Sequence, residues 1–520
     1  MQEEVIEIAK ALSSETRLNL IRVIGNNTFS LSEIEERFKL LSSSLYRESI
    51  YRALEKLVET GILRKYFDAF RKKQVYAIEQ NQITLNILSE KDDFSKKLTP
   101  EFKEKYPVYI RIWRELNAGN LFSVSDYKKI NDYSQYYKEI YSSSEEITSE
   151  KIIKNIQKLP WRQGVFNKQH WGYWLHSISP YIGRIKPAFA HWLIKASSKP
   201  NDVVLDPFCG IGTVPLEADI MKRKAIGIDL NPYAALISKA KFDRKLIEEH
   251  LQFLREIKLE TTKIDLSKVD LYIRQFFNDE TLKEIFALKK ILIKENQTFL
   301  LGCLMGILHG NRPGYLSAWT GCIIPMAPRK KGEIGFRVDK DIPEYRAVIP
   351  RLAAKVKRMY MNRFSLKIDS KIIEGDARKM PLQNNSVDVL ISSPPYYHTL
   401  DYVGANRLRL AILGFNEEKR GELKETLIQQ RQTYLEEMKK VGKEIYRVMK
   451  PNTYVIFVLG DVHTSSYTIN TAEDIGKLYQ ETGFEQIKII DDVIPRNKCA
   501  VQNGNHKLKK DRILILKTRK

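Results

Sequence analysis

Residues 202–213 read Asp-Val-Val-Leu-Asp-Pro-Phe-Cys-Gly-Ile-Gly-Thr. The apolar run that ends at Asp206 is typical of a buried strand. Gly210 and Gly212 then allow the backbone to turn tightly and to approach a ligand, and Thr213 is a residue type that caps helices. The stretch therefore predicts a strand, a ligand-binding loop and a helix, in an α/β sheet whose ligands bind where the strands end.

Further apolar runs, with helical patterns between most of them, read as strands of the same sheet. They cover residues 202–206, 224–229, 387–392, 453–459, 485–490 and 511–516. Between about 242 and 368 the alternation stops, and helical patterns dominate. The sequence therefore predicts a doubly wound α/β sheet with a helical insertion.

The acid that ends the next strand, Asp229, lies 23 positions after Asp206. It is well placed to accept hydrogen bonds from two ribose hydroxyls. A GxG loop alone would equally suit a dinucleotide-binding protein. The acid and proline before the glycines instead favour a cofactor that carries an ammonium or a sulfonium and has no pyrophosphate.

Residues 393–396 read Ser-Pro-Pro-Tyr and follow another buried-strand run. The exocyclic amine of a nucleobase is a poor nucleophile because its lone pair is delocalised into the ring. The Ser393 hydroxyl and the Pro394 carbonyl can each accept one amine N–H, and Pro395 helps to stiffen that geometry. Tyr396 offers a face on which a base taken out of the helix can stack. The segment predicts a clamp for an amine; a plain turn with a packed tyrosine is the alternative.

These segments carry a resemblance to a known enzyme family. Residues 206–213 resemble motif I of amino-group (N4-cytosine or N6-adenine) DNA methyltransferases, whose usual form is DPFxGxGT; only Ile211, where a serine is common, departs mildly from it. The resemblance implies a Rossmann-like S-adenosylmethionine-dependent methyltransferase sheet over residues 159–520. It also implies that the cofactor's ribose lies at Asp229, its adenine beside Asp376, and its methionine under segment 176–187, which ends at Pro187. The loop against the methionine would comprise Asp206, Pro207, Phe208, Cys209, Gly210, Gly212 and Thr213.

Among these enzymes Ser-Pro-Pro-Tyr leans towards N4 of cytosine, which makes Ser393, Pro394, Pro395 and Tyr396 the expected catalytic segment. Adenine N6, guanine N2 in tRNA and a non-catalytic DNA-binding regulator are the alternatives. Cytosine C5 is much less expected, because that reaction needs a cysteine nucleophile, usually after a proline, and no cysteine here follows one. The implied partner is duplex DNA with the target base flipped out. A restriction nuclease partner and the oligomeric state are left open.

Residues 1–80 read as four helices, at 3–12, 15–24, 30–38 and 44–59, followed by a hairpin. This order resembles a winged helix-turn-helix domain of the ArsR-like kind, whose fourth helix would be offered to a major groove. The DNA contacts would then be Arg52 and Lys56 on that helix and Arg71 and Lys72 at the hairpin tip. Acidic residues on the same helix leave a dimerisation or packing module as the alternative. Residues 81–158 read as a polar, helical connector.

The 520-residue chain is basic, with 86 Lys and Arg against 64 Asp and Glu and a formal net charge of +22. This excess favours a polyanionic partner, nucleic acid before a membrane surface. A solvated basic surface without a partner is the alternative. Side chains expected to meet DNA phosphates, beyond those above, are Arg407, Arg409, Arg496 and Lys498. The insertion would be a lid that helps target recognition, or else a structural cap.

Cysteine usage and the chain's start suggest a compartment. The four cysteines are scattered without a CxxC pair, so neither disulfides nor a zinc site nor any other metal site is predicted. No stretch approaches ~18 uninterrupted apolar residues, and the acidic start lacks an apolar signal region. We therefore expect a cytoplasmic protein without a membrane span.

Overall fold

The computed structural model describes residues 15–24, 29–39, 47–60, 62–68, 73–78, 146–161, 163–167, 171–310, 314–318, 343–360, 370–395, 400–430, 432–463, 468–493 and 510–520. The chain divides into two compact units. One comprises residues 1–129 with 312–314, and the other comprises residues 130–311 with 315–520.

The first unit is a small helical domain with a three-stranded antiparallel sheet, ordered β1-β3-β2. Its elements are α2 (Glu15–Ile24), β1 (Phe29–Ser30), α3 (Leu31–Lys39), α4 (Arg47–Glu59), β2 (Leu63–Asp68) and β3 (Lys73–Ile78). Ile50, Leu54 and Leu57 form the buried stripe of α4 that their helical spacing predicts. The expected helix at 3–12 lies outside the described residues, and the winged-helix resemblance stays a prediction.

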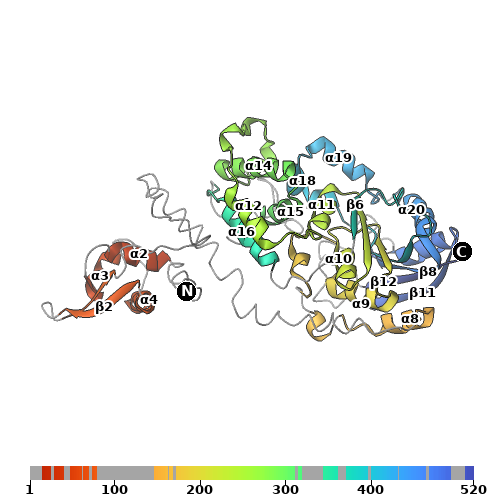
Figure 1. The fold of residues 1–520 in the computed structure, drawn as a ribbon, viewed down its shortest axis with the longest axis horizontal. Coiled ribbons are helices and arrows are strands. Elements are labelled where there is room, and N and C mark those ends of the chain that lie inside the picture. The colour runs from red at the N-terminus through yellow and green to blue at the C-terminus, as the bar shows by residue number, and fades with distance from the viewer. Residues whose placement is uncertain are drawn as a thin grey trace. The chain divides into compact units, whose positions relative to one another are not determined.

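The second unit is built on a seven-stranded mixed sheet (Figure 1). Its strands are β4 (Val203–Asp206), β5 (Lys224–Asp229), β6 (Lys371–Glu374), β7 (Val387–Ser392), β8 (Met449–Gly460), β11 (Phe484–Val493) and β12 (Lys510–Thr518). Their order is β11-β12-β8-β7-β4-β5-β6; the pairs β11–β12 and β12–β8 are antiparallel, and the others are parallel. The parallel strands run outward from β4 in both directions, so the strand order reverses between β4 and β7. In sheets of this kind ligands bind at that point.

Helices cover both faces of the sheet. The crossovers between β4, β5 and β6 include α10 (Thr213–Ile220) and α11 (Pro232–Ala240), and α9 (Pro187–Ser197) packs against α10. The other face carries α20 (Tyr434–Val448) and α21 (Thr471–Gln480). There Met438 and Ile445 bury their side chains against Leu205 and Val455 in one apolar core. This packing holds the carboxyl ends of β4 and β7 side by side.

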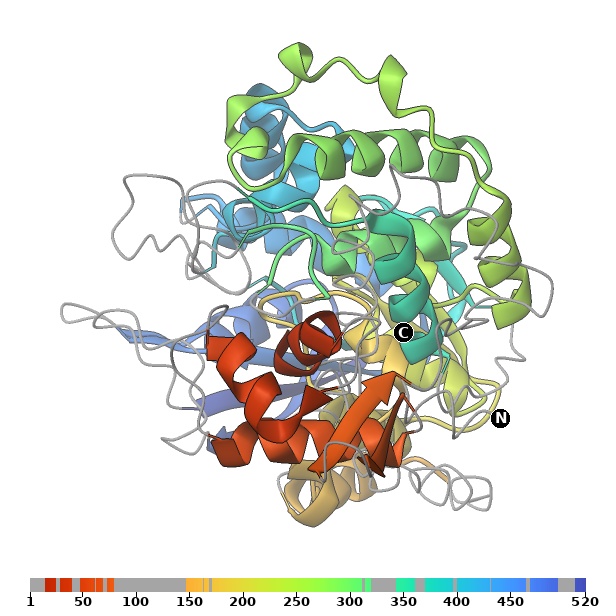
Figure 2. The ribbon, with the colours of Figure 1, turned by 90° about the vertical axis from the view of Figure 1, so that its left-hand side faces the viewer.

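The segment between α11 and β6 contains helices joined by turns, and its described residues include no strand. It contains α12 (Ile247–Glu256), η5 (Thr261–Lys263), η6 (Leu266–Lys268), α13 (Leu271–Arg274), α14 (Asp279–Lys294), α15 (Thr298–Ile307) and α16 (Val348–Met359). These helices gather on one side of the unit, coloured green in Figures 1 and 2. Residues 266–294 form three separate helical elements, because Asp270 and Asn278 accept N–H groups and start new helices.

Shorter elements complete the second unit: α8 (Ser149–Gln157), η3 (Gly164–Asn167), η4 (Trp174–Ser177), α17 (Tyr402–Ala405), α18 (Arg407–Leu413), α19 (Glu417–Thr426), β9 (Val462–His463) and β10 (Thr468–Ile469). Strand β6 has no counterpart in the sequence prediction, because it is four residues long and none of them is buried. Among the described helices, none combines the length and apolar character needed to cross a bilayer.

Candidate active site

A cleft at the carboxyl ends of β4, β5, β6 and β7 collects most of the residues that the sequence marks out. Those on its wall are Asp206, Pro207, Phe208, Cys209, Gly210, Thr213, Asp229, Asp376, Ser393 and Pro395. Gly212, Pro187 and Pro394 are not on the wall, and Tyr396 lies outside the described residues. Two segments separated by 180 residues in the sequence thus meet where the strand order reverses.

The glycine-rich loop depends on backbone conformations that favour glycine. Gly210 and Gly212 have φ angles of 53° and 71°. A Cβ atom on Gly212 would lie 2.2 Å from the Ser238 hydroxyl oxygen. The expectation that Thr213 caps the following helix is wrong. Gly212 occupies the N-cap position, and the buried Thr213 hydroxyl has no hydrogen-bond partner among the described residues.

Asp206 joins the two halves of the cleft. One of its carboxylate oxygens accepts the Ser392 hydroxyl at 2.6 Å and the Phe208 N–H at 3.2 Å. Ser392 is the last residue of β7, so this bond ties the end of β4 directly to the start of Ser393-Pro-Pro-Tyr. Burial raises the pKa of Asp206 to about 7, against the effect of these hydrogen bonds.

Asp229 shapes the loop and faces the same cleft. Its two carboxylate oxygens accept the Gly210 N–H at 2.7 Å and the Asn231 N–H at 2.9 Å. Burial raises the pKa of Asp229 to about 6, although both backbone hydrogen bonds oppose the shift. Each carboxylate oxygen keeps acceptor capacity beyond the one bond it makes, which suits the ribose hydroxyls that the sequence places there.

The Ser393 side chain has a defined orientation. Its hydroxyl donates to the Val458 carbonyl on β8 at 3.0 Å, so the hydroxyl proton is engaged and the oxygen's lone pairs remain. The Pro395 carbonyl accepts the Tyr434 hydroxyl at 3.0 Å, which fixes the segment against α20. The segment is therefore held from two sides, with an acceptor in the cleft.

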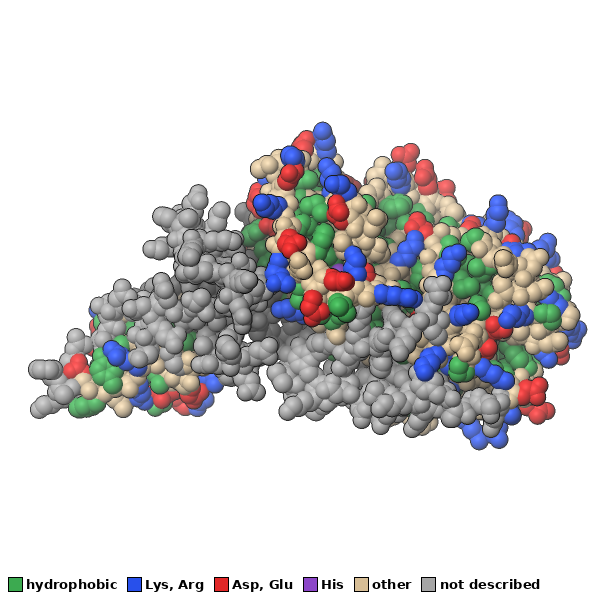
Figure 3. All heavy atoms as spheres, viewed as in Figure 1, with side chains coloured by type: hydrophobic (Ala, Val, Ile, Leu, Met, Phe, Trp, Pro, Cys, Tyr) green, Lys and Arg blue, Asp and Glu red, His purple; other side chains and the backbone are tan. Residues whose placement is uncertain are grey.

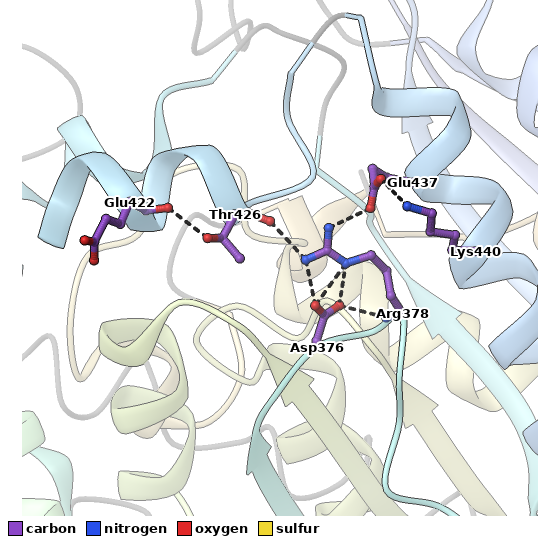
Figure 4. A network of polar contacts seen from close by, with 6 residues as sticks. All are labelled: Asp376, Arg378, Glu422, Thr426, Glu437 and Lys440. Carbon is purple, nitrogen blue, oxygen red and sulfur yellow. Dashed lines mark hydrogen bonds and ion pairs between the residues drawn. The ribbon is translucent and has the colours of Figure 1, made fainter.

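Asp376 lies on the cleft wall, but its carboxylate is already occupied (Figure 4). The Arg378 guanidinium bonds both of its oxygens, at 2.6–2.9 Å. Burial opposes ionisation, but the bonds and charge of Arg378 hold the pKa of Asp376 below its usual value. Arg378 also donates to Glu437 on α20 at 2.6 Å and to the Thr426 carbonyl of α19 at 3.2 Å.

The segment before α9 closes another side of the cleft. Tyr181, Gly183, Arg184 and Ile185 line it, and a Cβ atom on Gly210 would lie 3.4 Å from the Tyr181 ring. Behind this segment, the buried Glu217 carboxylate bonds His176 Nε2 at 2.7 Å. Its other oxygen bonds His191 Nδ1 at 3.1 Å. Pro187 is the first residue of α9 and packs behind the wall, where a Cβ on Gly172 would meet it.

The residues expected to contact DNA do not gather at the cleft as the expected cofactor-binding residues do. Arg52 and Lys56 are exposed or partly exposed on α4 and pair with Glu48 and Glu59. Arg407 is partly buried over the Tyr272 ring. The expectation for Arg409 is wrong: it is 1% exposed and lies over Tyr233, so it cannot meet a phosphate at the surface. Arg71, Lys72, Arg496 and Lys498 lie outside the described residues.

Surface charge gives no single DNA track on the face shown in Figure 3. There Lys and Arg side chains are interspersed with Asp and Glu over the described residues. The net charge of +22 is therefore not gathered into one basic patch on that part of the described surface.

Sequence reasoning missed several cleft residues. Tyr402, Leu427, Ile428 and Gln429 line the cleft, and Arg378 braces it. None of them belongs to a recognisable spacing pattern. Residues 427–429 could have been suspected only from their place between two helices that follow the clamp.

The sequence is similar to a DNA methylase family and to type II methyltransferases. A DNA methylase family (N6_N4_Mtase) matches residues 2–240. The chain is 26% identical over 207 residues to the type II methyltransferase M.MjaII of Methanocaldococcus jannaschii, covering 39% of this chain and 36% of that protein. It is 26% identical over 261 residues to M.BsoBI of Geobacillus stearothermophilus, covering 43% and 50%. The chain thus spans between about a third and a half of the length of these relatives.

The chain is also similar over shorter stretches to two other proteins. The tRNA (guanine(10)-N2)-dimethyltransferase of Methanocaldococcus jannaschii is 29% identical over 108 residues, 20% of this chain and 27% of that protein. A solved structure of a DNA modification methylase from Thermus thermophilus, complexed with S-adenosyl-L-methionine, is 20% identical over 28% of this chain and 52% of its own, with a TM-score of 0.18. The chain is thus similar to the DNA methylase family over residues 2–240 and to type II methyltransferases over part of its length.

The cofactor is S-adenosylmethionine, as the sequence predicts. The cleft fits it chemically. Two buried carboxylates, Asp206 and Asp229, face a space lined by loops, and their negative charge suits an ammonium and a sulfonium. Unpartnered polar atoms on Thr213 and Asn231, among the described residues, lie on the same wall.

Cofactor affinity is expected to depend on pH. A cation binds best when Asp206 and Asp229 are ionised, and their raised pKa values of about 7 and 6 leave them partly protonated in weak acid. Affinity should therefore fall as the pH drops from about 8 to about 5.5, by up to ~10-fold per pH unit for each proton that must be displaced. Calorimetric titration of S-adenosylmethionine at several pH values measures this. Asp206→Asn should flatten the profile, whereas equal affinity at all pH values would contradict the account.

Proposed function

We propose that this protein transfers a methyl group from S-adenosylmethionine to the exocyclic N4 amine of cytosine in DNA. The bound cofactor supplies an electrophilic methyl group on its sulfonium. The observation that carries the proposal is the convergence of the glycine-rich loop and Ser393 on one cleft, joined by the 2.6 Å bond from Ser392 to Asp206.

The chain's own groups would orient the amine. Because the Ser393 proton is directed to the Val458 carbonyl, the Ser393 oxygen can accept one amine N–H. For the second acceptor we keep the Pro394 carbonyl that the sequence predicts; Pro394 is not on the described cleft wall, and the neighbouring Pro395 carbonyl accepts the Tyr434 hydroxyl. Two acceptors on the amine favour a tetrahedral nitrogen, whose lone pair is free to attack the methyl group. Tyr396 would stack on the flipped base.

Cytosine N4 is favoured over adenine N6 by the serine that opens Ser-Pro-Pro-Tyr, since the family likeness pairs Asp or Asn at that place with adenine. Cytosine C5 chemistry is disfavoured, because burial raises the pKa of Cys209 and keeps its thiol protonated. A second candidate is methylation of a guanine amine in tRNA, which the similarity to a tRNA dimethyltransferase favours.

The experiment that separates these candidates uses the purified chain with S-adenosylmethionine labelled with tritium in the methyl group. Duplex DNA and unmodified tRNA are offered separately. The proposal expects label in DNA and background in tRNA. Label in tRNA alone would establish the second candidate, and cofactor binding without label in either would support a non-catalytic regulator.

We further propose that the first unit, as a winged-helix domain, helps to dock duplex DNA and that the protein works in the cytoplasm. A restriction nuclease partner fits the type II relatives. Exposed cations on α4 are the described groups that support docking.

Removing residues 1–80 should weaken DNA binding by about 10-fold or more, with little effect on single-turnover transfer at saturating DNA. Within the full chain, Arg52→Ala should weaken binding several-fold and make it less salt-dependent. Glu48→Ala is the matched control, because it removes only the acid that pairs with Arg52 and should leave or improve affinity. Unchanged affinity after both Arg52→Ala and the truncation would rule out a docking role.

A further inference from the structure

The loop between α19 and α20 places a carboxamide in the cofactor cleft. Leu427, Ile428 and Gln429 line the cleft, and Gln429 is 5% exposed. Gln429 Nε2 donates to the Lys424 carbonyl at 3.2 Å. That carbonyl belongs to the last turn of α19, where the helix leaves its own carbonyls without partners. The bond therefore fixes which end of the carboxamide is nitrogen, and the other end is the acceptor Oε1.

Gln429 Oε1 is buried and has no hydrogen-bond partner among the described residues. A buried acceptor of this kind is costly unless a ligand satisfies it. Asn231, on the same wall, presents the complementary group. Its Oδ1 accepts the Tyr233 N–H at the start of α11, which leaves a buried Nδ2 donor that is also without a partner in the described chain. Among the described residues, the cleft wall thus holds a free acceptor on Gln429 and a free donor on Asn231, each oriented by a backbone group, besides the unpartnered Thr213 hydroxyl.

Asp376, the residue that the family resemblance places by the adenine, is a poor acceptor for a further group. Both of its oxygens are bonded to the Arg378 guanidinium, and one of them also accepts the Arg378 backbone N–H. Through the Thr426 carbonyl and Glu437, the same guanidinium holds both ends of the loop that carries Gln429 (Figure 4). Asp376 and Arg378 therefore act together as a brace.

We propose that Gln429, and not Asp376, recognises the 6-amino group of the cofactor's adenine, with Oε1 accepting one amine N–H. Arg378 is the positioning residue that keeps this acceptor in the cleft. A 6-oxo purine would set a carbonyl against Oε1, so two acceptors would repel each other. The site therefore selects a 6-amino purine over a 6-oxo purine. The inference rests on the cofactor and not on transfer to DNA.

The test is calorimetric binding of S-adenosylhomocysteine and of its 6-oxo analogue, S-inosylhomocysteine, to the full chain without DNA. The intact protein should prefer the 6-amino compound by at least about 10-fold. Gln429→Leu should erase most of that preference, whereas Gln429→Glu, which keeps an acceptor, should retain it. Gln430→Leu is the matched control: Gln430 also bonds the Lys424 carbonyl but is not on the cleft wall, so its preference should be unchanged.

Arg378→Met should weaken binding of both compounds and speed amide hydrogen exchange at Leu427 to Gln429, which a role confined to cofactor contact would not do. The proposal is overturned if the intact protein binds both compounds equally. It is also overturned if Asp376→Ala erases the preference while Gln429→Leu retains it. Intact discrimination with no methyl transfer to DNA would count against the proposed function alone.

Discussion

Ser393→Ala should reduce methyl transfer to duplex DNA by at least about 100-fold while leaving S-adenosylmethionine affinity within about twofold. Alanine removes the oxygen whose proton is directed to the Val458 carbonyl and whose lone pairs face the cleft. The amine then loses one of two acceptors, and its lone pair stays delocalised in the ring. The cofactor loop is untouched, because its link to β7 runs through Ser392.

Single-turnover transfer of a tritiated methyl group, together with calorimetric cofactor binding, measures both halves of that prediction. Ser386→Ala is the control, since the Ser386 hydroxyl bonds only the Gln383 carbonyl among the described residues, on the exposed turn before β7. Full activity in Ser393→Ala would show that Ser393 does not hold the target amine. A parallel loss of cofactor affinity would show that the residue supports the fold of the cleft instead.

Asp229→Ala should weaken S-adenosylmethionine binding by about 100-fold. The carboxylate accepts the N–H groups of Gly210 and Asn231, and each charge-assisted hydrogen bond of this kind contributes about 1.5–3 kcal/mol. Without it, the glycine-rich loop loses its tie to β5 and the ribose loses its acceptor. Asp265→Ala, which removes an exposed helix-capping acid in the insertion, should leave binding unchanged. Wild-type affinity in Asp229→Ala would contradict the assignment of the cofactor loop.

Most of the sheet could be predicted from the sequence because its central strands are buried on both faces and read as continuous apolar runs. The seven-residue apolar stretch of β8 from Tyr454 to Gly460 is buried throughout, which is why it stands out. β6 could not be predicted in this way, because it is an exposed edge strand and needs no apolar run. Its position became visible only through its parallel pairing with β5.

The residues of the candidate site also differ in how readily the sequence reveals them. Asp206 and Ser393 lie within short segments of unusual composition, so their chemistry is legible in the sequence. Gln429 and Arg378 act through partners 5 and 59 residues away and carry no local pattern. Arg409 shows the converse error: a basic residue next to a motif suggested a phosphate contact, but its helix turns it into the interior over Tyr233.

Nucleoside mass spectrometry of duplex DNA, after incubation with the purified protein and methyl-labelled S-adenosylmethionine, tests the central claim most directly. The account predicts labelled N4-methylcytosine in DNA and none after Ser393→Ala. Labelled N6-methyladenine would keep the clamp but overturn the choice of base. DNA in which the label sits only on C5 of cytosine, or in which no nucleoside is labelled, would contradict transfer to an exocyclic amine.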